Sequence, residues 1–160
     1  MTVRDPATKV MSWEALRAWR HRQLGRVVFT NGVFDLLHPG HIDVLLGARR
    51  AGDALIVGLN SDASVRRLKG TGRPVRTDAE RVYVMAALEV VDAVTVFEQD
   101  TPLDLIMAVT PDVLVKGGDY TAETIVGAKE VCAWGGEVVV IPLTPHQSTT
   151  AIIERVRGSV

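Results

Sequence analysis

The residues with the clearest chemical potential are two histidines in residues 30–41, whose sequence is TNGVFDLLHPGH. Pro39 suits the first position of a helix, so we expect His38 at the N-cap and His41 in the first turn. Both imidazoles would then face one point beside the unpaired N–H groups at the positive end of the helix dipole. This pattern predicts an anion site in which two side chains donate hydrogen bonds to phosphate oxygens.

Other interpretations of the two histidines are weaker. One histidine alone would more often be a helix cap or a surface residue beside a turn, but two that flank Pro-Gly after an apolar segment favour function. Two histidines seldom hold zinc without further ligands, and no cysteine lies nearby, so we expect no metal site built from protein side chains. Gly32 and Gly40 would let a phosphate chain approach the backbone closely.

Basic residues form a second group, in a chain whose formal net charge is only −1. They are Arg66, Arg67, Lys69, Arg73 and Arg76. Each can be solvated in a surface loop, but the group follows a predicted strand and would neutralise a sugar phosphate or a triphosphate there. Arg81, in the first turn of the next predicted helix, would direct one more cation towards the same region.

Two further segments carry groups suited to a nucleotide. In residues 115–120 (VKGGDY), paired glycines make room for a flat or bulky ligand, and Asp119 can accept hydrogen bonds from hydroxyl groups. A tight turn explains that pattern nearly as well. In residues 147–150 (QSTT), Ser148 suits a helix N-cap, and three consecutive donors there would hold the outer phosphates of a nucleotide.

Alternating strands and helices would position these residues. The predicted strands are rich in valine and isoleucine and nearly continuously apolar, as strands covered on both faces should be. They are residues 27–30, 54–60, 93–97, 113–116 and 137–142. The predicted helices are residues 39–51, 78–90, 102–109, 123–134 and 149–157. This alternation favours a doubly wound, mostly parallel α/β sheet, whose ligands bind beyond the carboxyl ends of the strands, where the strand order reverses.

The first 25 residues precede this alternation. We expect them to form an N-terminal helical extension, followed by one domain at residues 26–160. The predicted helix of the extension covers residues 12–23, with Ser12 as its N-cap. Trp13 and Trp19 indicate that this helix docks, either on its own domain or on a partner subunit.

Composition limits the remaining possibilities. The 160 residues are 47% hydrophobic and 23% charged, the balance of a globular domain. The near-neutral charge creates no field that would attract nucleic acid or an anionic membrane. The sequence has no signal peptide and no run of about 18 apolar residues, so the cytoplasm is the expected location. Cys132, the one cysteine, is expected to fill the core.

Together these motifs resemble the small nucleotidyltransferases that share an HxGH motif, and among them the adenylyltransferase domain of bacterial ADP-heptose synthases. The resemblance covers about residues 27–156 and rests on four segments in the same order: TNGVFDLLHPGH, LNSDASVRRLKG, VKGGDY and STT. It implies a Rossmann-like fold and transfer of AMP from ATP to D-glycero-D-manno-heptose 1-phosphate, giving ADP-heptose and pyrophosphate. ATP would be the co-substrate, and Mg²⁺ is expected with it.

The resemblance also implies roles for individual residues. His38 and His41 would bind the ATP phosphates and stabilise the transition state, and Lys69 would bridge the phosphates of donor and acceptor. Asp35 and Asn60 would contact the acceptor. The remaining nucleotide contacts would come from Thr30, Asn31, Gly32, Val33, Phe34, Arg81, Lys116, Gly117, Asp119, Ser148 and Thr149. No covalent intermediate is needed, because the acceptor phosphate attacks the α-phosphorus directly and catalysis consists of positioning and charge neutralisation.

Departures from these relatives leave alternatives open. Residues 143–147 (LTPHQ) replace the Arg-Thr-x-Gly-Ile of glycerol-3-phosphate cytidylyltransferases, which argues against CTP. The sugar kinase domain of fused ADP-heptose synthases is missing here, so a separate kinase would supply the acceptor, and relatives suggest a homodimer. The alternative functions are a cytidylyl- or adenylyltransferase for another small phosphate, such as glycerol 3-phosphate, and a non-catalytic nucleotide-binding module.

Overall fold

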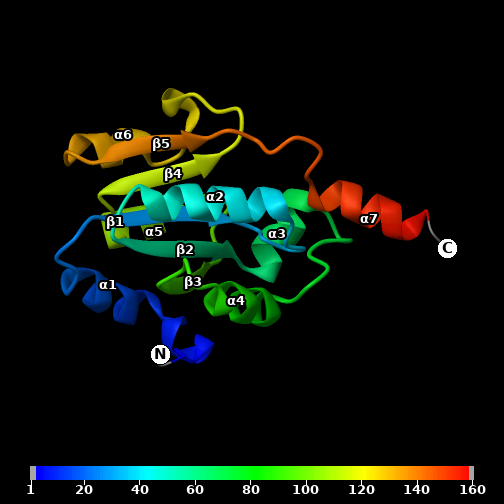
Figure 1. Ribbon diagram of the computed structural model, residues 1–160, viewed down its shortest axis with the longest axis horizontal. Coiled ribbons are helices and arrows are strands. Elements are labelled where there is room, and N and C mark those ends of the chain that lie inside the picture. The colour runs from blue at the N-terminus through cyan, green and yellow to red at the C-terminus, as the bar shows by residue number, and fades with distance from the viewer. Residues whose placement is uncertain (1–2, 159–160) are drawn as a thin grey trace.

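The computed structural model describes residues 3–158, which form one five-stranded sheet with the strand order β3-β2-β1-β4-β5 (Figure 1). Each pair of neighbouring strands is parallel. The strands are β1 (Val27–Gly32), β2 (Ala54–Asn60), β3 (Ala93–Phe97), β4 (Val113–Gly117) and β5 (Glu137–Ile141). The helices are α1 (Trp13–His21), α2 (Pro39–Arg50), α3 (Asp62–Lys69), α4 (Asp78–Ala87), α5 (Leu103–Val109), α6 (Ala128–Ala133) and α7 (Thr149–Arg157), with 3-10 turns η1 (Pro6–Lys9) and η2 (Ala122–Thr124).

Both faces of the sheet are covered by helices, and each face has its own hydrophobic core. On one face, Phe29 of β1 packs in a cluster with residues of α1, α5 and α6. On the other face, the neighbouring Val28 packs with residues of α2 and α4. Successive side chains of a strand point to opposite faces, so a central strand between two helical layers must be apolar throughout. The prediction of a Rossmann-like, doubly wound sheet is confirmed.

The predicted helix at residues 123–134 is wrong in its first half, which contains the turn η2 and only then α6. Gly127 separates the two, because its φ of 88° is a left-handed conformation that cannot continue a right-handed helix. The predicted helix at residues 102–109 begins one residue later, since Pro102 is the N-cap of α5. Cys132, expected in the core, is exposed near the end of α6.

One helix was not predicted at all. Residues 62–69, interpreted above as a basic loop, form α3. The Ser61 side chain accepts a hydrogen bond from the backbone N–H of Ser64 and so caps the first turn. Gly70 ends the helix with a φ of 94°. The short helix places Lys69 at its last turn, beside the carboxyl ends of the strands.

The N-terminal segment docks on its own domain, along the edge strand β3. The backbone N–H of Met11 donates to the Val94 carbonyl (2.9 Å), and the Trp13 indole Nε1 donates to the Val96 carbonyl (2.9 Å). Leu16 of α1 is fully buried in the core beneath the sheet. The position of Trp13 is therefore explained by contacts within the chain, without a partner subunit. The division into an extension at residues 1–25 and a domain at 26–160 stays a proposal.

We expect Trp13→Phe to lower the free energy of unfolding by about 1 kcal/mol, because the Val96 carbonyl loses its hydrogen-bond donor while the apolar contact is largely kept. Chemical denaturation followed by circular dichroism measures the change. Arg17→Gln, at an exposed position of the same helix, is the control and should change stability by less than about 0.5 kcal/mol. Equal stability of Trp13→Phe and this control would show that the indole bond does not hold the segment.

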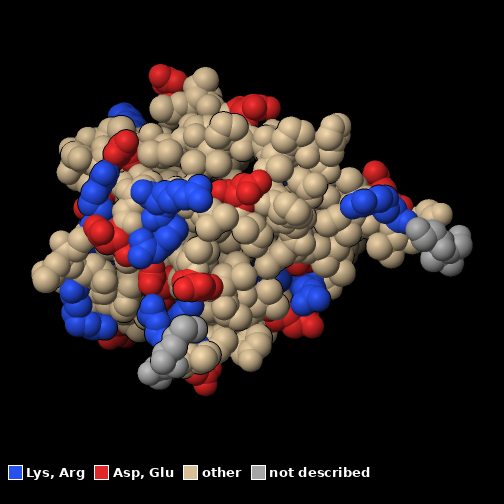
Figure 2. Space-filling model, viewed as in Figure 1, with Lys and Arg blue, Asp and Glu red and all other residues tan. Residues whose placement is uncertain are grey.

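The outer surface carries charges of both signs. Figure 2 shows basic and acidic side chains intermingled over the side that contains the N-terminal part of the chain, while other parts of this face are largely uncharged. Within residues 3–158, no helix is long and apolar enough to cross a membrane. Helix α7 extends away from the sheet at the C-terminal end of the chain (Figure 1).

Candidate active site

The candidate site lies at the carboxyl ends of β1 and β4. The strands β2 and β3 lie on one side of β1, and the chain then crosses to β4 and β5 on its other side. Ligands of open parallel sheets bind where the strand order reverses in this way. A cavity of about 370 Å³ opens there, and it is called the histidine cavity below. Its walls come from the loop after β1, the start of α2, the end of α3 and the start of α7.

Two stacked imidazoles form one wall of the histidine cavity. The ring centroids of His38 and His41 are 3.8 Å apart with an interplanar angle of 24°. As predicted, His38 is the N-cap of α2, with Pro39 at the first position. The Phe34 ring packs beside His41, with 5.1 Å between the ring centroids. Its backbone is left-handed (φ 47°), and this turn directs the chain from β1 into the site.

The Nδ1 atoms of both histidines are buried and have no hydrogen-bond partner in the part of the chain that the structure describes. Buried polar atoms are nearly always paired, so two unpaired imidazole nitrogens in residues that line a cavity indicate a missing ligand. The N-termini of α2 and α7 both contribute residues to this cavity. Backbone N–H groups at helix starts favour anions. The missing ligand is therefore expected to be anionic.

The histidine pair is uncharged at neutral pH. Burial, and to a smaller extent the neighbouring His38, lower the pKa of His41 to about 4. Burial also lowers the pKa of His38 from its ordinary value. An anion bound between them would favour the protonated rings and raise both pKa values. Binding of a polyphosphate is thus coupled to uptake of protons.

We expect ATP binding to be accompanied by net proton uptake at about pH 5.5. This pH lies above the pKa of His41 in the ligand-free protein, and a bound anion raises that pKa towards it. Calorimetric titration in two buffers of different ionisation enthalpy measures the number of protons. The double variant His38→Asn/His41→Asn corrects for protons bound by ATP itself. The same uptake in both proteins would contradict this role of the pair.

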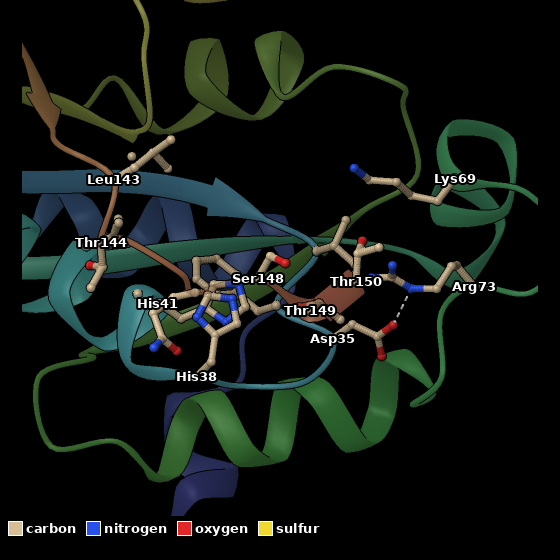
Figure 3. A pocket seen from close by; sticks show the side chains of 16 residues that line it. Asp35, His38, His41, Lys69, Arg73, Leu143, Thr144, Ser148, Thr149 and Thr150 are labelled. Carbon is tan, nitrogen blue, oxygen red and sulfur yellow. Dashed lines mark hydrogen bonds and ion pairs between the residues drawn. The ribbon is translucent and has the colours of Figure 1, made fainter. Parts of the chain in front are cut away.

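Lys69, Arg73 and Asp35 lie at the other end of the histidine cavity (Figure 3). Lys69 is exposed and unpaired in the described residues, and its side chain extends from the end of α3. The Arg73 Nε donates to Asp35 Oδ2 at 2.8 Å, so this cation is already compensated. Of the basic group in the sequence, Lys69 is therefore the cation best placed to meet a phosphate.

The Asp35 carboxylate holds the segment that follows Lys69. Its side chain is fully buried and also accepts hydrogen bonds from the backbone N–H groups of Val75 and Arg76, both at 2.9 Å. Burial by itself would raise the pKa of Asp35, but these N–H groups and the Arg73 guanidinium outweigh it and lower the pKa. Because its oxygens are occupied in this way, we assign Asp35 to positioning residues 73–76 and not to the acceptor contact expected above.

Arg81 does not point into the cavity. Its fully buried guanidinium donates to the carbonyl of Val33 (2.8 Å), to the carbonyl of Arg76 (3.1 Å) and to Asp62 Oδ1 (2.8 Å). These three bonds tie the loop after β1 to α3 and to the start of α4. The expected nucleotide contact is therefore replaced by support of the site from behind.

The residues Ser148 and Thr149 line the histidine cavity at the start of α7. The Ser148 hydroxyl caps this helix by accepting from the Ala151 N–H (3.0 Å), as predicted. The Thr149 hydroxyl donates to the Leu36 carbonyl at 3.3 Å. Thr150 and Gln147 complete this wall. The Thr149 bond thus joins the start of α7 to the loop after β1. It brings the hydroxyls of α7 and the two histidines of α2 to one cavity.

A second cavity of about 480 Å³, called the asparagine cavity below, adjoins the first. It is lined by Asn31, Asn60 and Lys116 among others, and Lys69 lines both cavities. A smaller cavity of about 200 Å³ contains Thr30, Gly32 and Val33 together with His41, Gly117 and Lys116. It therefore shares residues with each of its two larger neighbours. The carboxyl ends of β1 and β4 form the floor between them.

Most of the residues predicted for the site gather around these three cavities, and two, Arg81 and Asp119, do not. Asp119 is exposed and lines none of the three. Gly117 lines the first, where a side chain would collide with Val44 of α2. Val44 itself was missed, although it lies three residues after His41 and helical periodicity places both on one face. Thr144 was also missed, yet it follows the end of β5, where the strand-end rule applies.

No group of three or more His, Cys, Asp or Glu side chains that could hold a metal ion occurs among residues 3–158. The site combines imidazoles, amides, hydroxyls and lysines with the ion pair of Asp35 and Arg73. Such donors suit a ligand with many phosphate and hydroxyl oxygens.

Comparisons with known proteins point in the same direction. A family model described as cytidylyltransferase-like matches residues 29–155. The chain is 55% identical over 156 residues to "Bifunctional protein HldE" of Acidiphilium cryptum (strain JF-5), which is 98% of this chain and 32% of that protein. It is 60% identical over 142 residues to the protein of the same name from Rhodopseudomonas palustris (strain HaA2), covering 89% and 29%. The chain therefore spans about a third of the length of these relatives.

Solved structures show the same architecture. A lipopolysaccharide core biosynthesis protein from Thermoplasma volcanium GSS1 is similar with a TM-score of 0.61 and 25% identity, covering 77% of this chain and 99% of that one. A pantoate-beta-alanine ligase from Francisella tularensis, complexed with beta-gamma ATP and beta-alanine, gives a TM-score of 0.62 at 14% identity, covering 86% of this chain and 67% of that one. The second likeness concerns the fold alone.

Proposed function

This chain belongs to the cytidylyltransferase-like family, a group of nucleotidyltransferases, and from that premise we propose that it is an adenylyltransferase for a sugar 1-phosphate. The acceptor that we propose is D-glycero-D-manno-heptose 1-phosphate, and the products are ADP-heptose and pyrophosphate. The similarity to proteins named HldE and the residues of the asparagine cavity support this acceptor.

The observation that carries the proposal is the pair of buried, unpaired imidazole Nδ1 atoms between the starts of two helices. This arrangement is built for an anion with several oxygens, and the triphosphate of ATP has that chemistry. The two rings are uncharged in the ligand-free protein. Their interaction with the phosphates therefore becomes stronger when negative charge builds up beside them. That is the condition under which preorganised donors favour a transition state over a ground state.

The reaction follows from the positions of the groups. An oxygen of the acceptor phosphate attacks the α-phosphorus of ATP, a new O–P bond forms, and the bond from the α-phosphorus to the β-bridging oxygen breaks opposite to it. Pyrophosphate leaves with the bonding electrons. His38 and His41 hold the ATP phosphates, Ser148 and Thr149 contact them from α7, and Lys69 lies where donor and acceptor meet. Mg²⁺, when present, would compensate charge on the phosphate oxygens of the nucleotide, since residues 3–158 offer it no cluster of ligands.

Incubation of the protein with ATP, Mg²⁺ and the heptose 1-phosphate should release pyrophosphate in step with formation of ADP-heptose. A coupled pyrophosphate assay and chromatography of the sugar nucleotide measure the two products. CTP and glycerol 3-phosphate belong in the same panel, because the matching family is described as cytidylyltransferase-like. Turnover of CTP or of glycerol 3-phosphate alone would reject the proposed substrates, and nucleotide binding without any turnover would favour a non-catalytic module.

The remaining partners are also proposals. A sugar kinase must supply the acceptor phosphate. Because the relatives are called bifunctional and this chain matches about a third of their length, that kinase need not be the separate protein expected from the sequence. A homodimer and a cytoplasmic location, where ATP is available, remain predictions, and size-exclusion chromatography with light scattering tests the first.

A further inference from the structure

Lys116 is a cation for which the reaction described so far has no use. It stands near the end of β4, and its side chain is half-buried. Its Nζ atom donates a long hydrogen bond to Asn31 Oδ1 (3.5 Å) and lies 5.9 Å from the centre of the Tyr120 ring. Within residues 3–158 no carboxylate forms an ion pair with it. Burial lowers its pKa, and no acidic neighbour acts in the opposite direction.

A partly buried ammonium group without a counter-charge is unfavourable unless a ligand supplies the anion. The two other contacts of Lys116 supply only partial negative charge, from an amide oxygen and from the face of an aromatic ring. Arg73 and Arg81, by contrast, already have carboxylate partners. Among these cations near the site, Lys116 is therefore pre-positioned for an anion that arrives from outside the protein.

The location of Lys116 shows which anion this is. Lys116 lines the asparagine cavity and the small connecting cavity, but not the histidine cavity. The small cavity is also lined by His41, so the lysine and one imidazole of the pair border the same space. An anion on Lys116 and a triphosphate on the histidines would thus occupy neighbouring places. This is the relation that an attacking phosphate and the nucleotide must have.

The rest of the asparagine cavity suits the body of a sugar. The side-chain amides of Asn31 and Asn60 and the hydroxyls of Thr101 and Thr124 can exchange hydrogen bonds with sugar hydroxyl groups. Its volume of about 480 Å³ lies in the range of small-ligand sites. The cavity therefore combines two lysines, Lys116 and the shared Lys69, with neutral polar groups, and its one carboxylate, Asp100, is paired with Arg67.

We propose that Lys116 binds the phosphate group of the acceptor in the asparagine cavity, and that ATP occupies the histidine cavity. This assignment rests on the proposed adenylyltransferase function and moves Lys116 from the nucleotide, where the sequence placed it, to the acceptor. Lys69, which lines both large cavities, then contacts both substrates, while Lys116 acts on the acceptor alone.

The test compares Lys116→Met and Lys116→Arg with the wild-type protein under steady-state conditions. Lys116→Met should raise the KM for the sugar 1-phosphate roughly 30-fold, because a hydrogen bond to a charged group is lost, and should change the KM for ATP less than about 3-fold. Lys116→Arg keeps the positive charge and should recover most of the acceptor affinity. Lys129→Met, at an exposed position on α6, is the matched control and should leave both KM values unchanged.

The outcomes separate the two proposals. A wild-type protein that turns over no sugar 1-phosphate overturns the proposed function, and the role of Lys116 with it. An active wild type with a Lys116→Met variant that loses ATP affinity, or loses neither affinity, overturns the role of Lys116 alone. If circular dichroism shows that Lys116→Met is unfolded, Lys116→Gln takes its place, and the same split between the two KM values decides.

Discussion

Replacing His41 by alanine is expected to lower kcat by about 10³-fold while the affinity for ATP falls less than tenfold. Removal of one preorganised donor at a site of developing charge typically costs a factor of 10² to 10³, or about 2.7–4 kcal/mol in the transition state. His41 belongs at the upper end of that range, because its ring is the more deeply buried of the pair and its Nδ1 has no competing partner in the described residues. Single-turnover kinetics with a separate binding titration measure the two effects.

The matched control for this prediction is His21→Ala, an exposed histidine at the end of α1, which should keep wild-type activity. A double-mutant cycle with His38→Ala sharpens it. The stacked rings serve one ligand, so the double variant should lose much less than the product of the two single losses. Nearly wild-type kcat in His41→Ala would exclude the imidazole from catalysis, and fully multiplicative losses would show that the rings act independently.

The second large effect is expected for Asp35→Asn, which should lower the free energy of unfolding by about 3 kcal/mol and kcat/KM on the order of 10²-fold. The carboxylate accepts hydrogen bonds on both oxygens, so an amide NH₂ in place of one oxygen faces donors that it cannot satisfy. Residues 73–76 would then be held less firmly, and Lys69 lies only four residues before Arg73. Denaturant unfolding and steady-state kinetics measure the two changes.

The pH dependence provides an independent check on Asp35. Its pKa in the folded protein is lowered from 3.8, so its contribution to stability is complete above that value and is lost as the pH falls through the folded pKa. The wild-type protein should therefore lose stability on acidification below about pH 4 more steeply than Asp35→Asn does. Asp104→Asn, at an exposed position on α5, should follow the wild-type curve. Parallel curves of stability against pH for Asp35→Asn and wild type would show that the Asp35 carboxylate does not hold residues 73–76.

The sequence predicts the architecture well because each strand can be recognised from its own residues, which are nearly all apolar. Two of the helix starts predicted from side chains have the expected caps, at Ser12 and Ser148. Capping depends on neighbours within four residues, so a reader of the sequence has all the needed information. Helix α3 was missed because it is short, polar and basic, and in the structure it packs against β2.

The site was predicted less completely, because sequence patterns show which residues are charged but not which partners they find. Arg81 and Asp35 look like ligand-binding groups when they are read along the chain. In the structure they find Asp62, 19 residues away, and Val75, 40 residues away, and these contacts turn both into structural supports. The two histidines were easier, since proline, glycine and the helix start fix their relation within four residues. The surroundings of Lys116 could not be predicted from its own segment, because its contact Asn31 lies on the neighbouring strand β1.

The docking of residues 10–13 on β3 bears on how this protein can be shortened or fused. A parallel sheet of five strands has two open edges, and an uncovered edge strand is a template for pairing with another chain. Here the isolated bridge from Val10 to Val94 and the Trp13 indole occupy the outward-facing groups of one edge. A truncated protein that begins at residue 26 would expose that edge together with the apolar surface under Leu16. Truncated proteins that lack the first helix should therefore self-associate, and an N-terminal fusion partner should be joined before residue 10.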